Sequence, residues 1–290
     1  MAVLWVETVI NGILLGALFA LFGIGLAFAF GIMRIVNAAH GEMIVLSAYV
    51  AAMLLQGIHV NAFVMIVPVA AIMFVLGYVL QAVILNRVLG NDPIPALMVT
   101  FGLSIILRNL MLEFFGADPR SINAGPIQLL GINVFGISIG VLPLLVLAIV
   151  VVLLVVFRRF IRVSGLGRTL RATADDFQIV QIFGVNYRRM YCIAMGIAVA
   201  LSSVAGLMIA MRTTYSPFTG VDRLLLAFEV VIIGGLGSLW WMLLGGFILG
   251  IAELVSLQIN PNAGLLYAHL VFFVVLMVMP SGLSNWRRVA

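Results

Sequence analysis

Four ionisable side chains interrupt stretches of this sequence that are otherwise apolar. Glu229 and Glu253 fall within two such stretches, and Arg108 and Glu113 share a third. If the stretches cross a bilayer, each charge is costly there, so residues of this kind usually serve a solute or proton route or pair between helices. A spacing of five puts Arg108 and Glu113 on different faces of a helix, so either could pair elsewhere. We expect Glu229 and Glu253 to line a pathway for a polar solute, with structural pairing as the alternative.

Three more polar residues, Asn37, His40 and Glu42, stand where the first long apolar run breaks. Non-helical backbone at membrane depth is found only where protein or a water-filled cavity satisfies it. If this stretch re-enters the membrane, its free N–H groups and polar side chains could face the carboxylate of a solute. If it is a turn between two spans, these are ordinary interface residues, and the nearby Arg34 favours the turn.

The segment RTLRATADDFQIVQIFGV, from Arg168 to Val185, concentrates charges and capping signals. Residues 173–176 have the spacing of a loose capping box, so a helix is predicted to start there, and Gly184 can end it in the left-handed conformation. The predicted apolar face holds Phe177, Val180 and Phe183, with Ile179 and Ile182 beside them; the polar face holds Asp175, Gln178 and Gln181. Such a helix either lies on lipid headgroups or docks in a groove of a soluble partner.

Two pairs of glycines have the G-x-x-x-G spacing: Gly12 with Gly16, and Gly246 with Gly250. This spacing lets membrane helices approach each other closely, and we interpret both pairs as packing positions.

A second glycine cluster, Gly234, Gly235 and Gly237, is too dense for an undisturbed helix. It predicts a break in the helix, which is either a simple turn or a movable gate.

The composition places the chain in a membrane. Of its 290 residues, 64% are hydrophobic and 9% are charged, which leaves too few polar residues to cover a water-soluble surface. The net charge of +5 could suggest nucleic acid, but all fifteen basic residues are arginines and seven lie between Arg158 and Arg189. Membrane orientation explains that cluster better than a phosphate-binding surface does. Cys192 has no partner for a disulfide or a metal site, and the isolated His59 and His269 indicate structural roles.

Apolar segments of bilayer length predict an all-α, polytopic helical membrane protein. Val141–Phe157 is apolar on every face, unlike a barrel strand, which alternates. No basic residue precedes the first run, so it is expected to be a retained span rather than a cleaved signal. About twenty apolar residues cross a bilayer, and eight spans are predicted: Thr8–Met33, Val60–Leu85, Ala96–Phe115, Ile139–Phe157, Met190–Met211, Leu224–Leu239, Met242–Ile259 and Gly264–Met279. A shorter run, Met43–Gln56, is either a tilted span or a re-entrant half-helix.

The arginines predict the orientation. Burying the seven between Arg158 and Arg189 at about 3 kcal/mol each would cost on the order of 20 kcal/mol, so this segment lies in water. The loop 116–138 contains only Arg120. The positive-inside rule therefore places residues 158–189 in the cytoplasm, and the count of later spans places Arg287 and Arg288 on the same side.

Four stretches carry a resemblance when they are taken together: NAAHGEMIVLSAYVA (Asn37–Ala51), GLGRTLRATADDFQIVQIFGVN (Gly165–Asn186), GGLGSLWWMLLGGFILGIAE (Gly234–Glu253) and VFFVVLMVMPSGL (Val271–Leu283). They resemble one family, the permease subunits of branched-chain amino acid ABC transporters. They follow the family's order and intervals over almost the whole chain, so the resemblance implies a single permease domain over residues 1–290. Two departures, Ala38 in place of a bulkier residue and Trp240–Trp241 in place of Pro-Gly, bear on the solute rather than on the family.

The resemblance implies a coupling segment, within about 158–189, that contacts an ATPase. The residues assigned to it are Arg171, Ala172, Thr173, Asp175, Asp176, Phe177, Val180, Phe183 and Gly184. It also implies a bacterial inner-membrane importer for branched-chain or related amino acids, built with two ATPase subunits, a second permease and a periplasmic solute-binding protein. ATP and Mg would bind to the ATPases and no cofactor to this chain. The residues expected along the pathway are Asn37, His40, Glu42, Glu229 and Glu253.

The chain is therefore expected to be a permease without its own energy source, because a P-loop requires a lysine and the sequence has none. The alternative is a stand-alone secondary transporter or channel, for which Glu229 and Glu253 provide a sparse proton or sodium relay. An intramembrane enzyme is disfavoured, since the sequence has no H-E-x-x-H motif and no pair of aspartates in facing spans.

Overall fold

A computed structural model describes residues 2–57, 60–90, 92–134, 136–235, 239–261, 263–280 and 282–283. His59, Gly237, Arg287 and Arg288, for which the sequence made predictions, lie outside these residues. The helices are α1 (Ala2–Met33), α2 (His40–Gly57), α3 (Ile66–Val83), α4 (Ile94–Phe115), α5 (Val141–Val163), α6 (Gly165–Asp175), α7 (Phe177–Ile182), α8 (Tyr187–Arg212), α9 (Gly220–Gly234), α10 (Leu239–Ile259) and α11 (Gly264–Val278). The strands are β1 (Gly131–Val134) and β2 (Ile137–Gly140), and short 3-10 turns η1 (Ala62–Met65), η2 (Leu85–Arg87), η3 (Gly125–Gln128) and η4 (Pro217–Thr219) join the larger elements.

The helical membrane fold expected from the sequence is confirmed. Six helical segments within the described residues are long and apolar enough to cross a membrane: Val3–Met33, Ala62–Arg87, Ile94–Phe115, Val141–Val163, Tyr187–Arg212 and Leu239–Ile259. The other two expected spans correspond to α9 and α11, each of 15 residues. The short ninth run is α2, whose 18 residues extend about 27 Å at 1.5 Å per residue.

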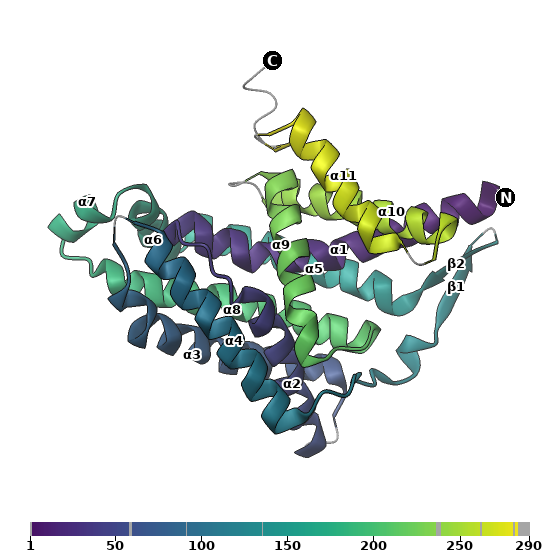
Figure 1. The fold of residues 1–290 in the computed structure, drawn as a ribbon, viewed down its shortest axis with the longest axis horizontal. Coiled ribbons are helices and arrows are strands. Elements are labelled where there is room, and N and C mark those ends of the chain that lie inside the picture. Colours follow the sequence, from purple (N-terminus) through teal and green to yellow (C-terminus); the bar gives the residue numbers. More distant parts are fainter. Residues whose placement is uncertain are drawn as a thin grey trace.

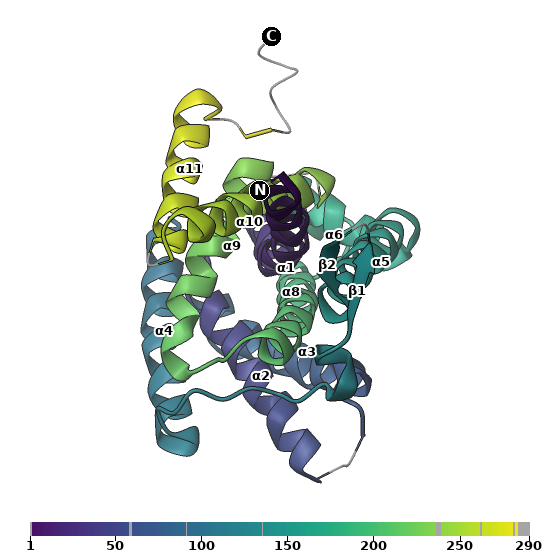
Figure 2. The same cartoon turned by 90° about the vertical axis from the view of Figure 1, so that its right-hand side faces the viewer.

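Two helices form the centre of the bundle. In their most apolar windows, 83% of the residues of both α1 and α8 are buried, against 39% for α10 and 22% for α4. In the end-on view of Figure 2, α1 and α8 lie in the middle, whereas α4 and α11 lie on the edge. Lipid tails are as apolar as leucine, so close packing rather than exclusion from water must hold the central helices together.

The glycine pairs provide that packing. A Cβ added to Gly12 would lie 2.7 Å from the Cα of Ile251, and one added to Gly246 would lie 3.0 Å from the backbone nitrogen of Ala20. A Cβ on Gly16 would overlap the Gly246 carbonyl. The two G-x-x-x-G pairs therefore face each other where α1 crosses α10, which confirms their interpretation as packing positions.

The two ends of the bundle carry different elements. Helices α6 and α7 lie at one end, and the amino terminus of α1 lies with the hairpin of β1 and β2 at the other (Figure 1). The strands pair antiparallel, with Gly131 opposite Gly140. The chain leading to the hairpin is held to the loop after α8 by two backbone hydrogen bonds between Arg120 and Tyr215, of 2.9 and 2.8 Å. The arginine-rich segment and the arginine-poor loop thus lie at opposite ends, as the orientation argument requires.

Candidate functional site

The chain reverses inside the bundle between α1 and α2. His40 Nε2 lies 3.0 Å from the carbonyl oxygen of Phe22 and 3.2 Å from the hydroxyl of Ser202. Phe22 precedes Met33, the last residue of α1, by eleven residues, so α2 begins about 16 Å back along α1. Residues 34–39 therefore fold back to the middle of the bundle. The sequence favoured a turn at the membrane interface for this segment, and the structure does not have the turn there.

The polar groups at this break are mostly satisfied within the protein. Asn37 and His40 are each 1% exposed. The side-chain oxygen of Asn37 accepts a hydrogen bond of 3.0 Å from the amide of Ala39. The hydroxyl of Thr100, on α4, accepts one of 3.1 Å from the amide of Ala38. His40 thus ties the start of α2 to α1 and α8, the amide of Ala38 ties it to α4, and Asn37 fixes the turn that leads into it.

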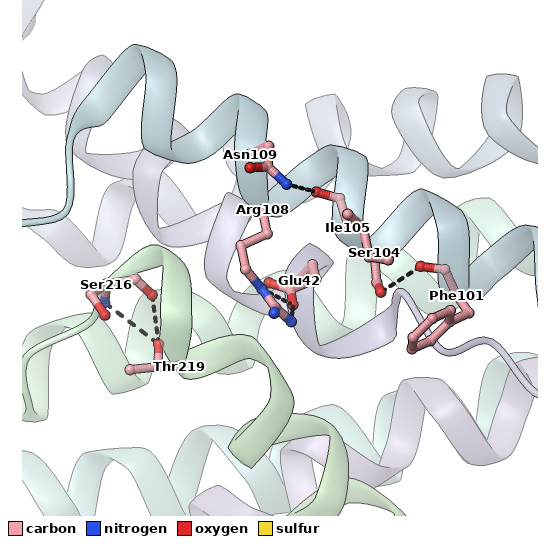
Figure 3. A network of polar contacts seen from close by, with 8 residues as sticks. All are labelled: Glu42, Phe101, Ser104, Ile105, Arg108, Asn109, Ser216 and Thr219. Carbon is pink, nitrogen blue, oxygen red and sulfur yellow. Dashed lines mark hydrogen bonds and ion pairs between the residues drawn. The ribbon is translucent and has the colours of Figure 1, made fainter.

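Glu42, two residues further along α2, meets Arg108 of α4 (Figure 3). Its Oε1 accepts hydrogen bonds from Nη2 at 2.5 Å and from Nε at 3.1 Å. The side chain of Glu42 is 2% exposed and that of Arg108 is 28% exposed. The sequence analysis did not predict this pair, because its two residues lie 66 positions apart. The signal that could have indicated it is that an acidic and a basic side chain at membrane depth both need partners. Glu113 lies on the exposed surface of α4.

The second oxygen of Glu42 has no hydrogen-bond partner. It lies against Gly220, the first residue of α9, where an added Cβ would overlap the carboxylate. Thr219, just before α9, donates a hydrogen bond of 2.8 Å to the carbonyl of Ser216 and so shapes this turn (Figure 3). The amino-terminal end of a helix carries partial positive charge, so the carboxylate lies between a guanidinium and the positive end of α9.

Glu229 and Glu253 belong to a second charged cluster. Glu229 Oε1 lies 2.5 Å from Nδ1 of His269 on α11, with side chains 7% and 27% exposed. Glu253 lies near Arg223, Arg212 and His269. The remaining Oε2 atoms of both glutamates are buried without hydrogen-bond partners. His269 contacts Glu229, so its assignment as an isolated residue was wrong; again, the partners come from different helices.

The predicted helix break at the second glycine cluster is confirmed for its described part. Helix α9 ends at Gly234, and Gly235 follows with a φ of 79°, a conformation that glycine adopts readily. The amide of Leu283 donates a hydrogen bond of 2.8 Å to the carbonyl of Ile233, so the chain beyond α11 packs on this break. The structure thus contains a turn at this point.

The arginine-rich segment forms two helices instead of the single helix predicted to start at Thr173. Thr173 lies inside α6, where its hydroxyl donates to the carbonyl of Thr169 at 2.8 Å, a bond typical of a helix interior. Asp176 caps α7 instead, with its carboxylate accepting from the amides of Gln178 and Ile179 at 2.8 and 3.1 Å. Gly184 ends the segment with a φ of 79°, as predicted.

Helix α7 divides its apolar residues between two sides. Val180 is 7% exposed and packs inward, whereas Ile182 and Phe183 are 83% and 81% exposed. The ring of Phe177 lies 5.2 Å from that of Tyr187 on α8. The single apolar face predicted from periodicity was therefore wrong: one part anchors α7 to the bundle, and the other is presented outward. Arg171, Ala172, Asp175 and Asp176 are also exposed.

The chain is similar to known transport permeases. The family described as "Branched-chain amino acid transport system / permease component" matches residues 8–280. The high-affinity branched-chain amino acid transport system permease protein LivH of Escherichia coli is 28% identical, over 96% of this chain and 95% of its own. BraD of Pseudomonas aeruginosa, described in the same words, is 29% identical over the same shares. A probable LivH of Methanocaldococcus jannaschii is 21% identical over 96% of this chain and 92% of its own.

No solved structure matches the chain. The family match extends over nearly all of the sequence and includes both clusters of charged residues and the arginine-rich segment. The chain belongs to the permease components of branched-chain amino acid transport systems.

Proposed function

We propose that this permease forms part of an ATP-driven importer for branched-chain or related amino acids, and that separate ATPase subunits drive it through α6 and α7. The observation that carries the proposal is the outward display of Ile182 and Phe183 at the arginine-rich end of the bundle. Large apolar side chains presented together on a polar segment are typical of a surface that a partner covers. The solute class comes from the names of the relatives.

The structure of α7 suits the transmission of force. Asp176 fixes its start, Gly184 fixes its end, and Val180 and Phe177 anchor it to the bundle. The next helix, α8, is one of the two central helices. An ATPase that binds Ile182 and Phe183 would therefore act on the middle of the bundle and shift its equilibrium between two conformations.

The test is to replace both exposed residues, Ile182→Ser and Phe183→Ser. Truncating central apolar contacts in an interface typically costs 2 kcal/mol or more, or about a thirtyfold loss of affinity. We expect the ATPase to stop co-purifying and solute uptake to fall with it. Leu129→Ser is the matched control for ATPase co-purification, because Leu129 is 92% exposed and lies two residues before β1, whose hairpin is at the opposite end of the bundle (Figure 1). Normal co-purification and uptake in the double variant would refute the proposal.

The second permease is assigned to the face that carries α4 and α11. Arg108 and His269 belong to this face and are each partly exposed, at 28% and 27%. Lipid would be a poor neighbour for either group, so a protein surface or a water-filled pathway should cover them. We assign the translocation pathway to this boundary, with Glu42, Glu229 and Glu253 behind it. A solute-binding protein would deliver cargo at the hairpin end.

The glutamates also favour a second candidate, a stand-alone carrier. Glu229, His269 and Glu253 form a titratable cluster of the kind that relays protons. Reconstitution distinguishes the two functions. A carrier would take up solute from a proton gradient when this chain alone is in the vesicle, whereas the permease would need its ATPases and ATP.

A further inference from the structure

A basic cavity of about 690 Å³ lies between α1, α5, α6 and α10. Four arginines line it, Arg34, Arg158, Arg162 and Arg171, and no acidic residue does. They come from three separate segments: the linker after α1, the end of α5, and α6. Positive charges gathered in this way repel one another unless an anion lies among them.

None of the four guanidiniums is ion-paired within the part of the chain that the structure describes, where the two ion pairs are Glu42–Arg108 and Glu229–His269. Arg171 Nη2 donates a hydrogen bond of 3.3 Å to the backbone carbonyl of Arg162, which uses one of its several donors. Arg34 has a φ of 54°, which is uncommon for a residue other than glycine. The cavity therefore keeps its positive charge available to a ligand.

The rest of the lining is apolar and aromatic. Phe28 and Phe157 pack edge to face, with ring centroids 4.9 Å apart, and Met242 lies beside them. Trp240 also lines the cavity and is 37% exposed; tryptophan is enriched at the membrane–water interface. A small inorganic anion would leave this apolar surface unused.

The cavity lies at the depth of lipid headgroups. Val155 and Val156 are exposed on α5, at 49% and 61%, and belong to its apolar surface. Arg158 follows Val155 by three residues, or about 5 Å along the helix. A ligand held by Arg158 would thus have its charge at the edge of the hydrocarbon layer, close to the exposed valines.

We propose that this cavity binds an anionic phospholipid. The phosphate lies among the four guanidiniums, which donate charge-assisted hydrogen bonds to its oxygens, and an acyl chain packs on Phe28 and Phe157. Basic pockets between membrane helices are suited to anionic headgroups. Since Arg171 belongs to α6, the bound lipid bridges the membrane spans and the segment that precedes α7. The site does not depend on the proposed docking of an ATPase.

The experiment compares variants of the assembled transporter in lipid nanodiscs of phosphatidylcholine, with and without phosphatidylglycerol. Binding of phosphatidylglycerol is measured by native mass spectrometry. Each arginine near an anionic surface contributes about a fivefold gain in affinity, so the variant Arg158→Gln/Arg162→Gln should bind about 25-fold more weakly. Arg159→Gln is the matched control: Arg159 is exposed on the same helix and does not line the cavity. Its lipid binding should not change.

Two further measurements keep the outcome clear. The thermal midpoint of unfolding in phosphatidylcholine alone should be the same for all variants. If the double variant does not fold, the single variant Arg162→Gln replaces it. Equal losses in Arg158→Gln/Arg162→Gln and Arg159→Gln would overturn the site. Competition by inorganic phosphate at matched concentration would show a plain anion site and overturn the lipid. Loss of ATPase co-purification without a change in lipid binding would show that the arginines contact a protein.

Discussion

Helices α10 and α4 are held to the bundle in different ways. Helix α10 crosses α1 with glycine against glycine, so that backbone meets backbone. Helix α4 is mostly exposed; a few apolar contacts, among them the stacking of Phe115 on Tyr49, hold it together with two polar contacts, from Arg108 to Glu42 and from Thr100 to the linker before α2. Close packing allows one arrangement of two helices, whereas a few polar contacts can be broken and remade. The comparison indicates a fixed centre, α1 with α8 and α10, and an edge, α4 with α11, that can move or accept a partner.

The largest effect is expected from filling the glycine crossing. In Gly16→Leu the new side chain would overlap the backbone of α10, and neither helix can withdraw without losing its other contacts. We expect no folded protein in the membrane. Gly102→Leu is the control on α4, because nothing lies within 4 Å of a Cβ added there. Comparable expression of both variants, judged by size-exclusion chromatography, would show that the centre is not fixed in this way.

The next effect concerns the ion pair between α2 and α4. Arg108→Met leaves the buried Glu42 carboxylate without its partner, at a cost on the order of 3 kcal/mol, and should lower the thermal midpoint. Glu42→Gln should cost less, because Arg108 is 28% exposed and can turn toward water. Both variants should reduce uptake. If Glu42→Gln is the more destabilising of the two, the carboxylate is not the group that depends on the pair.

A smaller effect is expected at the second attachment of α4. Thr100→Val keeps the shape of the side chain but removes the hydroxyl that bonds the amide of Ala38. An unsatisfied buried amide costs about 1–3 kcal/mol, so the thermal midpoint should fall by less than in Arg108→Met. Ser104→Ala is the control, since the Ser104 hydroxyl bonds only within α4, to the carbonyl of Phe101.

The smallest effect is expected at the cap of α7. Asp176→Ala removes the carboxylate that accepts from two amides, at a cost of about 1 kcal/mol to a short helix. ATPase activity coupled to solute should fall several-fold while the bundle keeps its thermal midpoint, because α7 lies outside the spans. Asp176→Asn retains an acceptor and should restore coupling. A fall in the thermal midpoint equal to that of Arg108→Met would mean that α7 is part of the fixed centre.

The sequence predicted the features that depend on local pattern. The long apolar helices follow from runs of apolar residues, the close packing at the two glycine pairs from their spacing, and the end of the segment after α7 from Gly184. Each of these depends on the pattern within one segment of the chain.

The features that were missed depend on which helices become neighbours. Glu42 meets Arg108 and Glu229 meets His269 across separations of 66 and 40 residues, and periodicity carries no information about such pairs. The depth of His40 was missed because a break in an apolar run does not show whether the chain turns at the interface or folds back. Helix α7 starts after the cap at Asp176 and ends at Ile182, so Phe183 lies past its last residue and is exposed, whereas Val180 packs inward.

The most direct test of the account is the chemical accessibility of Phe183 in whole membranes. Cys192, the single cysteine of the chain, is replaced by serine, and Phe183→Cys provides the one reactive thiol. A membrane-impermeant maleimide should label it in inside-out vesicles and not in intact cells, and the assembled ATPase should protect it. Labelling from outside the cell, or equal labelling with and without the ATPase, would contradict the claim that α7 presents this residue to a cytoplasmic partner.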